Sequence, residues 1–398
     1  MRKYIFAIAS LLAFIAACTS QDDIYKDFVV KGGRVYPAKP VNVETISGYQ
    51  RVTIKWEKPK DPAVAMSRLF WNNKADSVDV AYSAEGKASY TVTGLEDRSY
   101  VFYIVNFDKN GNRSLDVEVT ANPYGSNWLI SHSERSVNGY CRGDSAVLVF
   151  SRATYEMVQT RVAYVNTSGK LVEYPTPLPA NQDTIVLYDA MKGKKVYFKS
   201  SFKPEGGDDV VENTSWTKSA HGLLYNLDVS NWTVKATEYQ VQGAYTPNKI
   251  FDGLTESAGG RYVSNAADGY KEVFPKILSI DTHSEAGMEP TVFEMSFYQN
   301  PVDDSYRFIK DLALYIGNTE YDPDAGESYA STYGGFVFKR TFSTTRVCQT
   351  VSFNATGRYM AIVFINSNNL AAYFVDLWEA VPFGYIEGDS DVPYPDFK

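Results

Sequence analysis

The chain has 398 residues, 39 Lys and Arg against 47 Asp and Glu, and a net charge of −8. A net acidic chain disfavours nucleic acid and strongly anionic polymers as partners, and a neutral ligand fits better. The length exceeds what one hydrophobic core usually serves, which predicts two or three domains. The 30 Tyr, 22 Phe and 27 Gly, spread over many short alternating runs, predict an all-β fold of mostly antiparallel sheet.

The first residues have the pattern of an export signal. Arg2 and Lys3 precede an apolar run that ends Ile15-Ala16-Ala17-Cys18. This run is too short for a membrane-spanning helix, which needs about 20 apolar residues. Its end resembles the lipobox of bacterial lipoproteins, whose signal is cut before a cysteine that is then acylated. The resemblance implies a signal peptide over residues 1–17, lipidation at Cys18 and a lipidated tether over residues 18–39; the alternative is a plain secretory peptide.

Removal of residues 1–17 would leave 37 basic against 47 acidic residues, a net charge of −10. The tract Ser20-Gln21-Asp22-Asp23 resembles the acidic tether that sends lipoproteins of Bacteroidota to the cell surface, although a solvated linker has the same composition. We therefore expect a lipid-anchored protein of the outer membrane, exposed at the cell surface and touching the membrane only through its lipid.

Residues 40–122 form the first predicted domain. Strands are expected at 52–56, 68–71, 90–92 and 100–105, with tight turns at Asn72-Asn73 and at Asp108 to Asn112. Trp56 on an early strand and Leu95 followed by Tyr100 resemble the core tryptophan and the tyrosine corner of a fibronectin type III sandwich. The interval between Leu95 and Tyr100 is one residue shorter than usual in that family, which puts the corner hydrogen bond in question.

Residues 123–224 repeat this plan, with strands expected at 146–150, 160–165, 184–188 and 196–202 and a turn at 166–169. The stretch from Asp23 to Leu224 resembles an uncharacterised family of two-sandwich lipoprotein modules from Bacteroidota. This resemblance implies a lineage and a location but no chemical activity. Cys141 and Cys348 are far apart in sequence, so we expect no structural disulfide and no thiolate metal site.

Residues 230–383 contain an ordered series of motifs. Asn248 to Gly253, read as an apolar strand and an Asp-Gly turn, is followed by expected strands at 275–281, 291–298, 312–316, 357–364 and 374–379. The series resembles the discoidin, or coagulation factor V/VIII type C, fold, which includes the family 32 carbohydrate-binding modules. The resemblance implies a galactose-binding-like jelly-roll. Residues 384–398 are expected to be a C-terminal tail.

The Asp-Gly turn could bring oxygen ligands together, and hard oxygen ligands are what calcium prefers. The resemblance implies a structural calcium ion held by Asp252, Ser257 and Glu379, where Ser257 replaces the more usual threonine. The alternative is an ordinary turn without an ion.

In the discoidin type of jelly-roll, ligands bind to loops at one end, where aromatic rings stack on sugars and Asn or Arg side chains bond hydroxyls. Gly259 stands where an aromatic residue is frequent, which leaves a protein partner open. The candidate glycan-binding residues are Arg261, Tyr262, Asn265, Tyr333, Asn366, Asn368 and Asn369.

The sequence shows no catalytic centre, and we expect no catalytic residues. His132, His221 and His283 lack metal-ligand spacing, and there is no nucleophile elbow or phosphate-binding loop. The pairs Asp208-Asp209 and Asp303-Asp304 lie in polar, turn-like stretches, where acidic residues are usually solvated. The expected function is binding of a neutral glycan or polysaccharide, together with partner proteins of a glycan-uptake system. The alternative is an envelope scaffold or adhesin that binds a protein.

Overall fold

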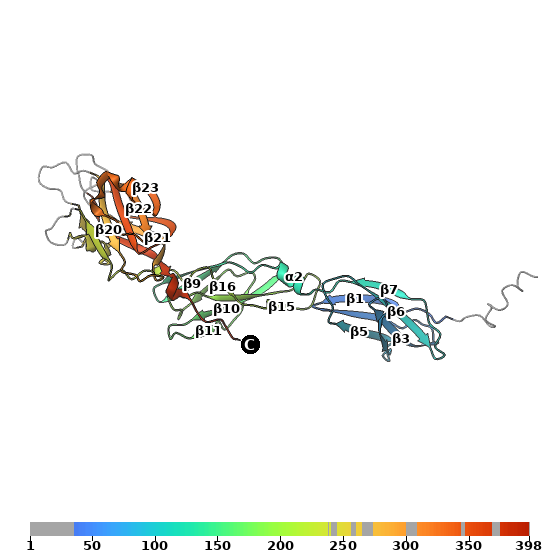
Figure 1. Cartoon of the computed structure of the whole chain (residues 1–398). Helices are drawn as coiled ribbons and strands as arrows, with labels where there is room; N and C mark the ends of the chain where they lie inside the picture. Colours follow the sequence, from blue (N-terminus) through green and yellow to red (C-terminus); the bar gives the residue numbers. More distant parts are fainter. Residues whose placement is uncertain are drawn as a thin grey trace, which may run out of the picture. The chain divides into compact units, whose positions relative to one another are not determined.

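The computed structural model describes residues 36–237, 239, 245–255, 260–264, 274–299, 309–343, 347–367 and 375–397. The chain divides into two compact units. Unit 1 comprises Met1–Ser131 and Pro204–Asp209, and unit 2 comprises His132–Lys203 and Val210–Lys398. Both units consist of antiparallel sheets with a few short helices, so the predicted all-β class is confirmed (Figure 1). Among the described helices, none has both the length and the apolar character needed to cross a membrane.

Unit 1 contains two facing groups of strands. One sheet has the order β1-β2-β5 and the other β4-β3-β6-β7. Alternate side chains of β2 point inward, so Val52, Ile54 and Trp56 are almost fully buried. Trp56 is 1% exposed, as predicted for a core residue. The elements are β1 Val41–Gly48, β2 Arg51–Glu57, β3 Val64–Trp71, β4 Asp76–Val80, β5 Lys87–Thr93, β6 Tyr100–Asp108, β7 Val117–Ala121 and α2 Ser126–Ser131.

The turns of unit 1 follow their sequence signals. Asn72 and Asn73 adopt positive φ, which the tight turn between β3 and β4 requires. The Asp108 carboxylate accepts hydrogen bonds from the backbone N–H groups of Asn110 and Asn112 at 2.9 and 2.8 Å. The Tyr100 hydroxyl accepts a hydrogen bond from the Glu96 N–H at 3.0 Å, so the shortened interval keeps a corner hydrogen bond.

The first sandwich of unit 2 pairs a six-stranded sheet with a three-stranded one. The first has the path β11-β10-β14-β15, with β12 on β10 and β16 on β14, and the second has the order β13-β9-β8. Leu148, Phe150, Val162 and Phe198 meet in its core. The strands are β8 Val137–Arg142, β9 Ser145–Phe150, β10 Met157–Val165, β11 Leu171–Glu173, β12 Leu178–Pro179, β13 Thr184–Leu187, β14 Tyr197–Phe202, β15 Val211–Glu212 and β16 Thr217–Lys218.

The second sandwich of unit 2 is the C-terminal domain. Its sheets have the orders β17-β27-β21-β24 and β18-β20-β25-β22-β23, with a small pair β19-β26. The inner faces enclose one large core that includes Leu278, Phe297, Leu312 and Phe364. The strands are β17 Tyr225–Asn226, β18 Thr233–Ala236, β19 Tyr262–Val263, β20 Lys276–Asp281, β21 Pro290–Tyr298, β22 Ile309–Gly317, β23 Phe336–Thr341, β24 Cys348–Thr356, β25 Tyr359–Ser367, β26 Asp376–Leu377 and β27 Glu379–Ile386.

Short helices complete this domain: η2 Pro247–Phe251, η3 Pro323–Ser328, α3 Tyr329–Thr332 and α4 Glu387–Ser390. The segment before Asp252 was expected to be a strand, and that prediction is wrong because it forms η2. Pro247 occupies the first helical turn, where its fixed φ favours a helix. Asp252 therefore ends a 3₁₀ turn, with Ile250 buried beneath it.

The last residues of the chain pack on the first sandwich of unit 2. The predicted boundary at residue 383 falls inside β27, which continues to Ile386. Beyond it, Tyr394 packs on Tyr197 and Phe397 on Trp216, with ring centroids 5.6 and 6.0 Å apart. Glu387 forms an ion pair with Lys195. These contacts join the C-terminal segment to the sheet that contains β14 and β16.

Candidate functional site

Four ionisable side chains gather at one end of the C-terminal domain. Asp252 follows η2, Arg261 precedes β19, Asp376 begins β26 and Glu379 begins β27. The strand pairings bring them together, because β19 pairs with β26 and Glu379 pairs with Tyr298, the last residue of β21. We call Asp252, Arg261, Asp376 and Glu379 the charged end.

Asp252 and Glu379 face a common turn. The Gly253 N–H donates to Glu379 Oε2 at 3.2 Å, and the Leu254 N–H donates to Asp252 Oδ1 at 3.1 Å. Glu379 is 3% exposed. Burial, and secondarily the charge of Asp252, raises the pKa of Glu379 to about 7.

The chemistry of this pair suits a cation, although the two carboxylates do not belong to a group of three or more metal-ligating side chains among the described residues. Asp252 Oδ2 is buried and accepts no hydrogen bond among the described residues, and only Lys249 Nζ, 3.5 Å away, approaches it as a cation. Two carboxylates that are desolvated and repel each other would be stabilised by a divalent ion. Ser257, the third expected ligand, lies outside the described residues.

Arg261 is held in a fixed position. Its Nη1 lies 3.2 Å from Asp376 Oδ2, and its guanidinium lies over the Tyr245 ring at 5.0 Å. The two side chains of the ion pair are 13% and 1% exposed. Arg261 Nε has no hydrogen-bond partner within the described part of the chain. The ion pair therefore fixes Arg261 and leaves one of its donors unused.

Two neighbouring side chains also keep unused donors. Trp378 Nε1 and Gln299 Nε2 are buried without a partner among the described residues. Trp378 lies between Asp376 and Glu379 in sequence. Its backbone N–H, unlike the indole N–H, has a partner and donates to the Tyr298 carbonyl at 2.9 Å. Buried donors without partners are rare in folded proteins, and each calls for a specific reason. A ligand rich in hydroxyl groups could supply the missing acceptors.

The structure separates the predicted glycan-binding residues. The assignment of Tyr262 is wrong, because this residue has zero exposure and stacks on Phe364 in the core, with centroids 6.0 Å apart. The Asn366 amide donates to Asp311 Oδ2 at 2.7 Å and its Oδ1 accepts from the Asp311 N–H, so Asn366 ties β25 to β22. Asn265, Asn368 and Asn369 lie outside the described residues.

Tyr333 lies at the opposite end of the domain from the charged end. Gln299, which follows β21, accepts a hydrogen bond from the Ile309 N–H, so the charged end lies beside the start of β22. Tyr333 lies near the other end of this strand, where the Ile316 N–H donates to the Gly335 carbonyl. The nine residues of β22 span roughly 27 Å. Arg261 and Tyr333, which the sequence analysis assigned to one glycan-binding site, therefore lie at opposite ends of the domain.

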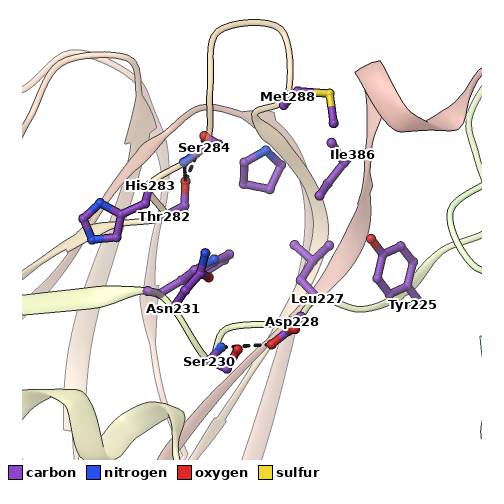
Figure 2. Close-up of a pocket in the computed structure, with 12 residues that line it drawn as sticks. Tyr225, Leu227, Asp228, Ser230, Asn231, Thr282, His283, Ser284, Met288 and Ile386 are labelled. Carbon is purple, nitrogen blue, oxygen red and sulfur yellow. Dashed lines mark hydrogen bonds between the residues drawn. The ribbon is translucent and has the colours of Figure 1, made fainter.

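A cavity of about 410 Å³ also opens at the end away from the charged end (Figure 2). Its lining combines apolar residues such as Leu227, Met288 and Ile386 with small polar ones. Asp228 is the one carboxylate among the described lining residues, and its Oδ1 accepts a hydrogen bond from the Ser230 N–H at 3.0 Å. The pair of carboxylates that glycoside hydrolysis needs is therefore missing from this lining.

A hydroxyl, an imidazole and a carboxylate lie in a row beside this cavity. His283 Nε2 is 2.9 Å from Thr233 Oγ1, and His283 Nδ1 is 3.3 Å from Asp281 Oδ2. Asp281 also accepts hydrogen bonds from Arg358 Nε and Nη2 at 2.9 and 3.0 Å. Figure 2 shows the His283 ring directed away from the cavity, so the row does not face an enclosed substrate position.

The acidic pairs give no catalytic arrangement in the part that is described. Arg51 donates to Asp209 Oδ1 at 2.5 Å and, by this hydrogen bond first, lowers the pKa of Asp209. Asp303 and Asp304 lie outside the described residues.

Among the described residues, no group of three or more His, Cys, Asp or Glu side chains could hold a metal ion.

Sequence reasoning missed Asp376 as a member of the charged end, and it missed the neighbouring Trp378 and Gln299. Asp376 and Glu379 flank Trp378 in a segment that is otherwise apolar, and acids in a buried strand are a signal of pairing or ligation. Gln299 had no signal, because its role depends on the contact with Ile309.

The N-terminal part of the chain matches a known protein family. Residues 18–208 match the DUF4998 family, described as a domain of unknown function, which agrees with the resemblance to an uncharacterised family found in this region. No curated protein matches the chain in sequence.

Several solved structures are similar to parts of the chain. The C-terminal domain of a chitobiase from Bacteroides fragilis is 14% identical, covering 40% of this chain and 98% of its own, with a TM-score of 0.32. The family 32 carbohydrate-binding module of Streptococcus pneumoniae EndoD is 13% identical, covering 39% and 97%, with a TM-score of 0.29. A SusE-like protein is 10% identical, covering 86% and 96%, with a TM-score of 0.30. Likenesses at this level establish no ligand for this chain.

Proposed function

We propose that this protein is a non-catalytic, cell-surface lipoprotein that binds a neutral carbohydrate through the charged end of its C-terminal domain. The observation that carries the proposal is the set of buried donors without partners at this end: Arg261 Nε, Trp378 Nε1 and Gln299 Nε2. A sugar offers many hydroxyl oxygens as acceptors, and its binding would satisfy donors that folding leaves unpaired.

The order of motifs over residues 230–383 supports the same ligand class, because the domain resembles the discoidin type of jelly-roll. The calcium ion implied by that resemblance would neutralise Asp252 and Glu379 and hold the turn at Gly253. The net charge of −8 favours a neutral glycan over an anionic one.

A glycan array with the full chain tests the proposal, with Arg261→Lys as the variant. Lysine keeps a positive charge for Asp376 but loses Nε and the planar fork, so we expect affinity to fall about tenfold or more. Arg340→Lys on β23, where the arginine is exposed, is the matched control and should bind normally. Silence of the wild type across neutral glycans, together with co-purifying envelope proteins, would favour the scaffold or adhesin function instead.

The lipid anchor has its own test. Cys18→Ser should leave the protein without lipid, so that it no longer partitions with the outer membrane after cell fractionation. Metabolic labelling with a fatty acid should mark the wild type and not the variant. Equal partitioning and equal labelling of the two proteins would remove the lipoprotein assignment and leave the carbohydrate proposal intact.

A further inference from the structure

A cluster of four tyrosines lies at the end of β22 that is remote from the charged end. Tyr333 packs on Tyr321, Tyr315 and Tyr329 with centroid distances of 4.8, 5.5 and 6.2 Å. Tyr315 belongs to β22, and the others come from the excursion between β22 and β23. We call Tyr315, Tyr321, Tyr329 and Tyr333 the tyrosine end.

A cavity of about 340 Å³ opens beside this cluster. One wall is the turn over residues 317–322, and the other is the segment over residues 332–335. Gly335 has a φ of 72°, and a Cβ there would meet the Ile316 carbonyl at 2.0 Å, so the second wall can approach the sheet only with glycine. The volume lies at the lower end of the range of small-molecule sites, about 300 to 1,000 Å³.

Hydrogen bonds between the two walls hold the cavity open in one shape. The Tyr321 hydroxyl donates to the Gly334 carbonyl at 2.9 Å, and the Tyr333 hydroxyl donates to the Asp322 carbonyl. Burial raises the pKa of Tyr321 to about 12 and also raises that of Tyr333, so both hydroxyls remain protonated donors. A cavity that is already formed loses little entropy when a ligand binds.

The lining indicates the class of ligand. Tyr333 presents an aromatic surface, and such surfaces pack well on the C–H faces of sugar rings. The charged residues among the described lining are the acids Glu320 and Asp322, which accept hydrogen bonds from hydroxyls and repel anions. Lys235 pairs with Glu320 at 2.5 Å but does not line the cavity.

We propose that the tyrosine end is a second carbohydrate subsite, which takes one neutral sugar ring in the cavity bordered by Tyr333 and the turn over residues 317–322. This inference rests on the proposed function, because it adds a subsite for the same ligand class. The two subsites lie at opposite ends of β22, roughly 27 Å apart along the strand. A polysaccharide long enough to reach both would bind with avidity, whereas a short oligosaccharide would not.

Affinity electrophoresis with the full chain tests the second subsite. The gels contain a neutral β-glucan, xylan or galactomannan, and polygalacturonate serves as the anionic comparison. Gly334→Leu is the blocking variant, because a Cβ at Gly334 meets no atom within 4 Å and leucine can occupy the cavity wall without backbone strain. Tyr333→Ala removes the aromatic surface. Tyr155→Ala, at a tyrosine that is 68% exposed in the first sandwich of unit 2, is the matched control.

We expect the neutral polysaccharide that retards the wild type to retard Gly334→Leu and Tyr333→Ala at least fivefold more weakly, while Tyr155→Ala behaves as wild type. Far-ultraviolet circular dichroism and the melting temperature of Gly334→Leu should match those of the wild type. Wild-type retardation in the Gly334→Leu variant would overturn the second subsite and leave the proposed function standing. A wild type that no neutral polysaccharide retards would overturn both.

Choline chloride is added to the same gels as a cationic competitor. A neutral sugar ring should not be displaced by choline, so unchanged retardation is expected. If choline binds with a dependence on Tyr333 and displaces the polysaccharide, the tyrosine end is a cation site and the assignment to a sugar is overturned.

Discussion

Unit 1 and the charged end use buried polar groups in opposite ways. In unit 1, the Trp56 indole donates to Ser67 Oγ at 3.0 Å, and Ser67 donates to the Val80 carbonyl. Asn106 is bonded through its N–H, its amide nitrogen and its amide oxygen, to Ser114, Ala38 and Tyr82. At the charged end, Asp252, Arg261 and Trp378 each keep a buried polar atom without a partner among the described residues.

The difference separates structural polar groups from candidate binding groups. A buried network that satisfies its own members stabilises one conformation and has no need of a ligand. Buried groups that folding leaves unsatisfied carry a desolvation cost of about 1–3 kcal/mol each, and they persist where a ligand or ion supplies the missing partner. Among the described residues of unit 1, Asp97 Oδ1 is such an atom, and the other oxygen of this carboxylate accepts a hydrogen bond from the Trp128 N–H at 3.0 Å.

The largest expected effect is in unit 1. Trp56→Ala should lower the free energy of unfolding of this unit by about 3 to 5 kcal/mol, because it leaves a cavity and removes the indole N–H that donates to Ser67 Oγ. Trp56→Phe keeps most of the packing and isolates the loss of the hydrogen bond. Urea denaturation followed by circular dichroism gives both values. An unchanged midpoint for Trp56→Ala would contradict its place in the core.

The pKa of Glu379 predicts the pH dependence of the C-terminal domain without added metal. The ordinary value is 4.5 and the folded value is about 7, so the folded state holds the proton more tightly than the unfolded state. Stability should therefore fall as pH rises from about 4.5 to about 7, by up to about 3 kcal/mol in total. Glu379→Gln should flatten this dependence in thermal melts in the presence of a chelator. An equal slope for variant and wild type would show that another group titrates.

Calcium should act on the same carboxylates in the opposite direction. Saturation at about 100 times the dissociation constant should add about 2.7 kcal/mol to the stability of the domain and remove the loss at high pH. Asp252→Ala deletes an anionic ligand and should make the melting temperature indifferent to calcium. Identical wild-type melts in chelator and in millimolar calcium, with no metal by elemental analysis, would return Asp252 to an ordinary turn residue.

The smallest expected effect concerns the buried hydrogen-bond network of unit 1. The Tyr82 hydroxyl donates to Asn106 Oδ1 at 2.6 Å within the satisfied network of unit 1. Tyr82→Phe should cost about 1 kcal/mol in urea denaturation, because one internal hydrogen bond is lost and the ring remains. Glycan retardation should not change. A change in glycan binding on this substitution would mean that the network of unit 1 also serves a ligand.

Strand positions were predictable because alternating side chains report burial directly. The runs at Val52 to Trp56 and at Thr291 to Tyr298 became β2 and β21, and alternate side chains of β2 point inward. The segment before Asp252 differs from the predicted strand because a short apolar run does not distinguish a strand from a 3₁₀ turn, and Pro247 favours the helical turn. Tyr262 follows Arg261 in a polar stretch, so its sequence surroundings gave no sign of the core contact with Phe364.

The separation of Tyr333 from Arg261 was in principle readable from the strand order. Paired strands of an antiparallel sheet run in opposite directions, so the segment that joins β22 to β23 lies at the Gly317 end of β22, away from Ile309 and the charged end. What no pattern in the sequence predicted is which buried donors stay unpaired. Trp378 and Gln299 acquire that property only from atoms brought together by distant strands.

The packing of Phe397 on Trp216 and of Tyr394 on Tyr197 has a consequence for biosynthesis. These two aromatic residues are synthesised nearly two hundred residues after the sheet that they cover. Until they are made, Trp216 and Tyr197 lack this cover, and a nascent chain or one cut short before residue 394 presents apolar surface. Quality control could therefore recognise such shortened copies by a single uncovered patch.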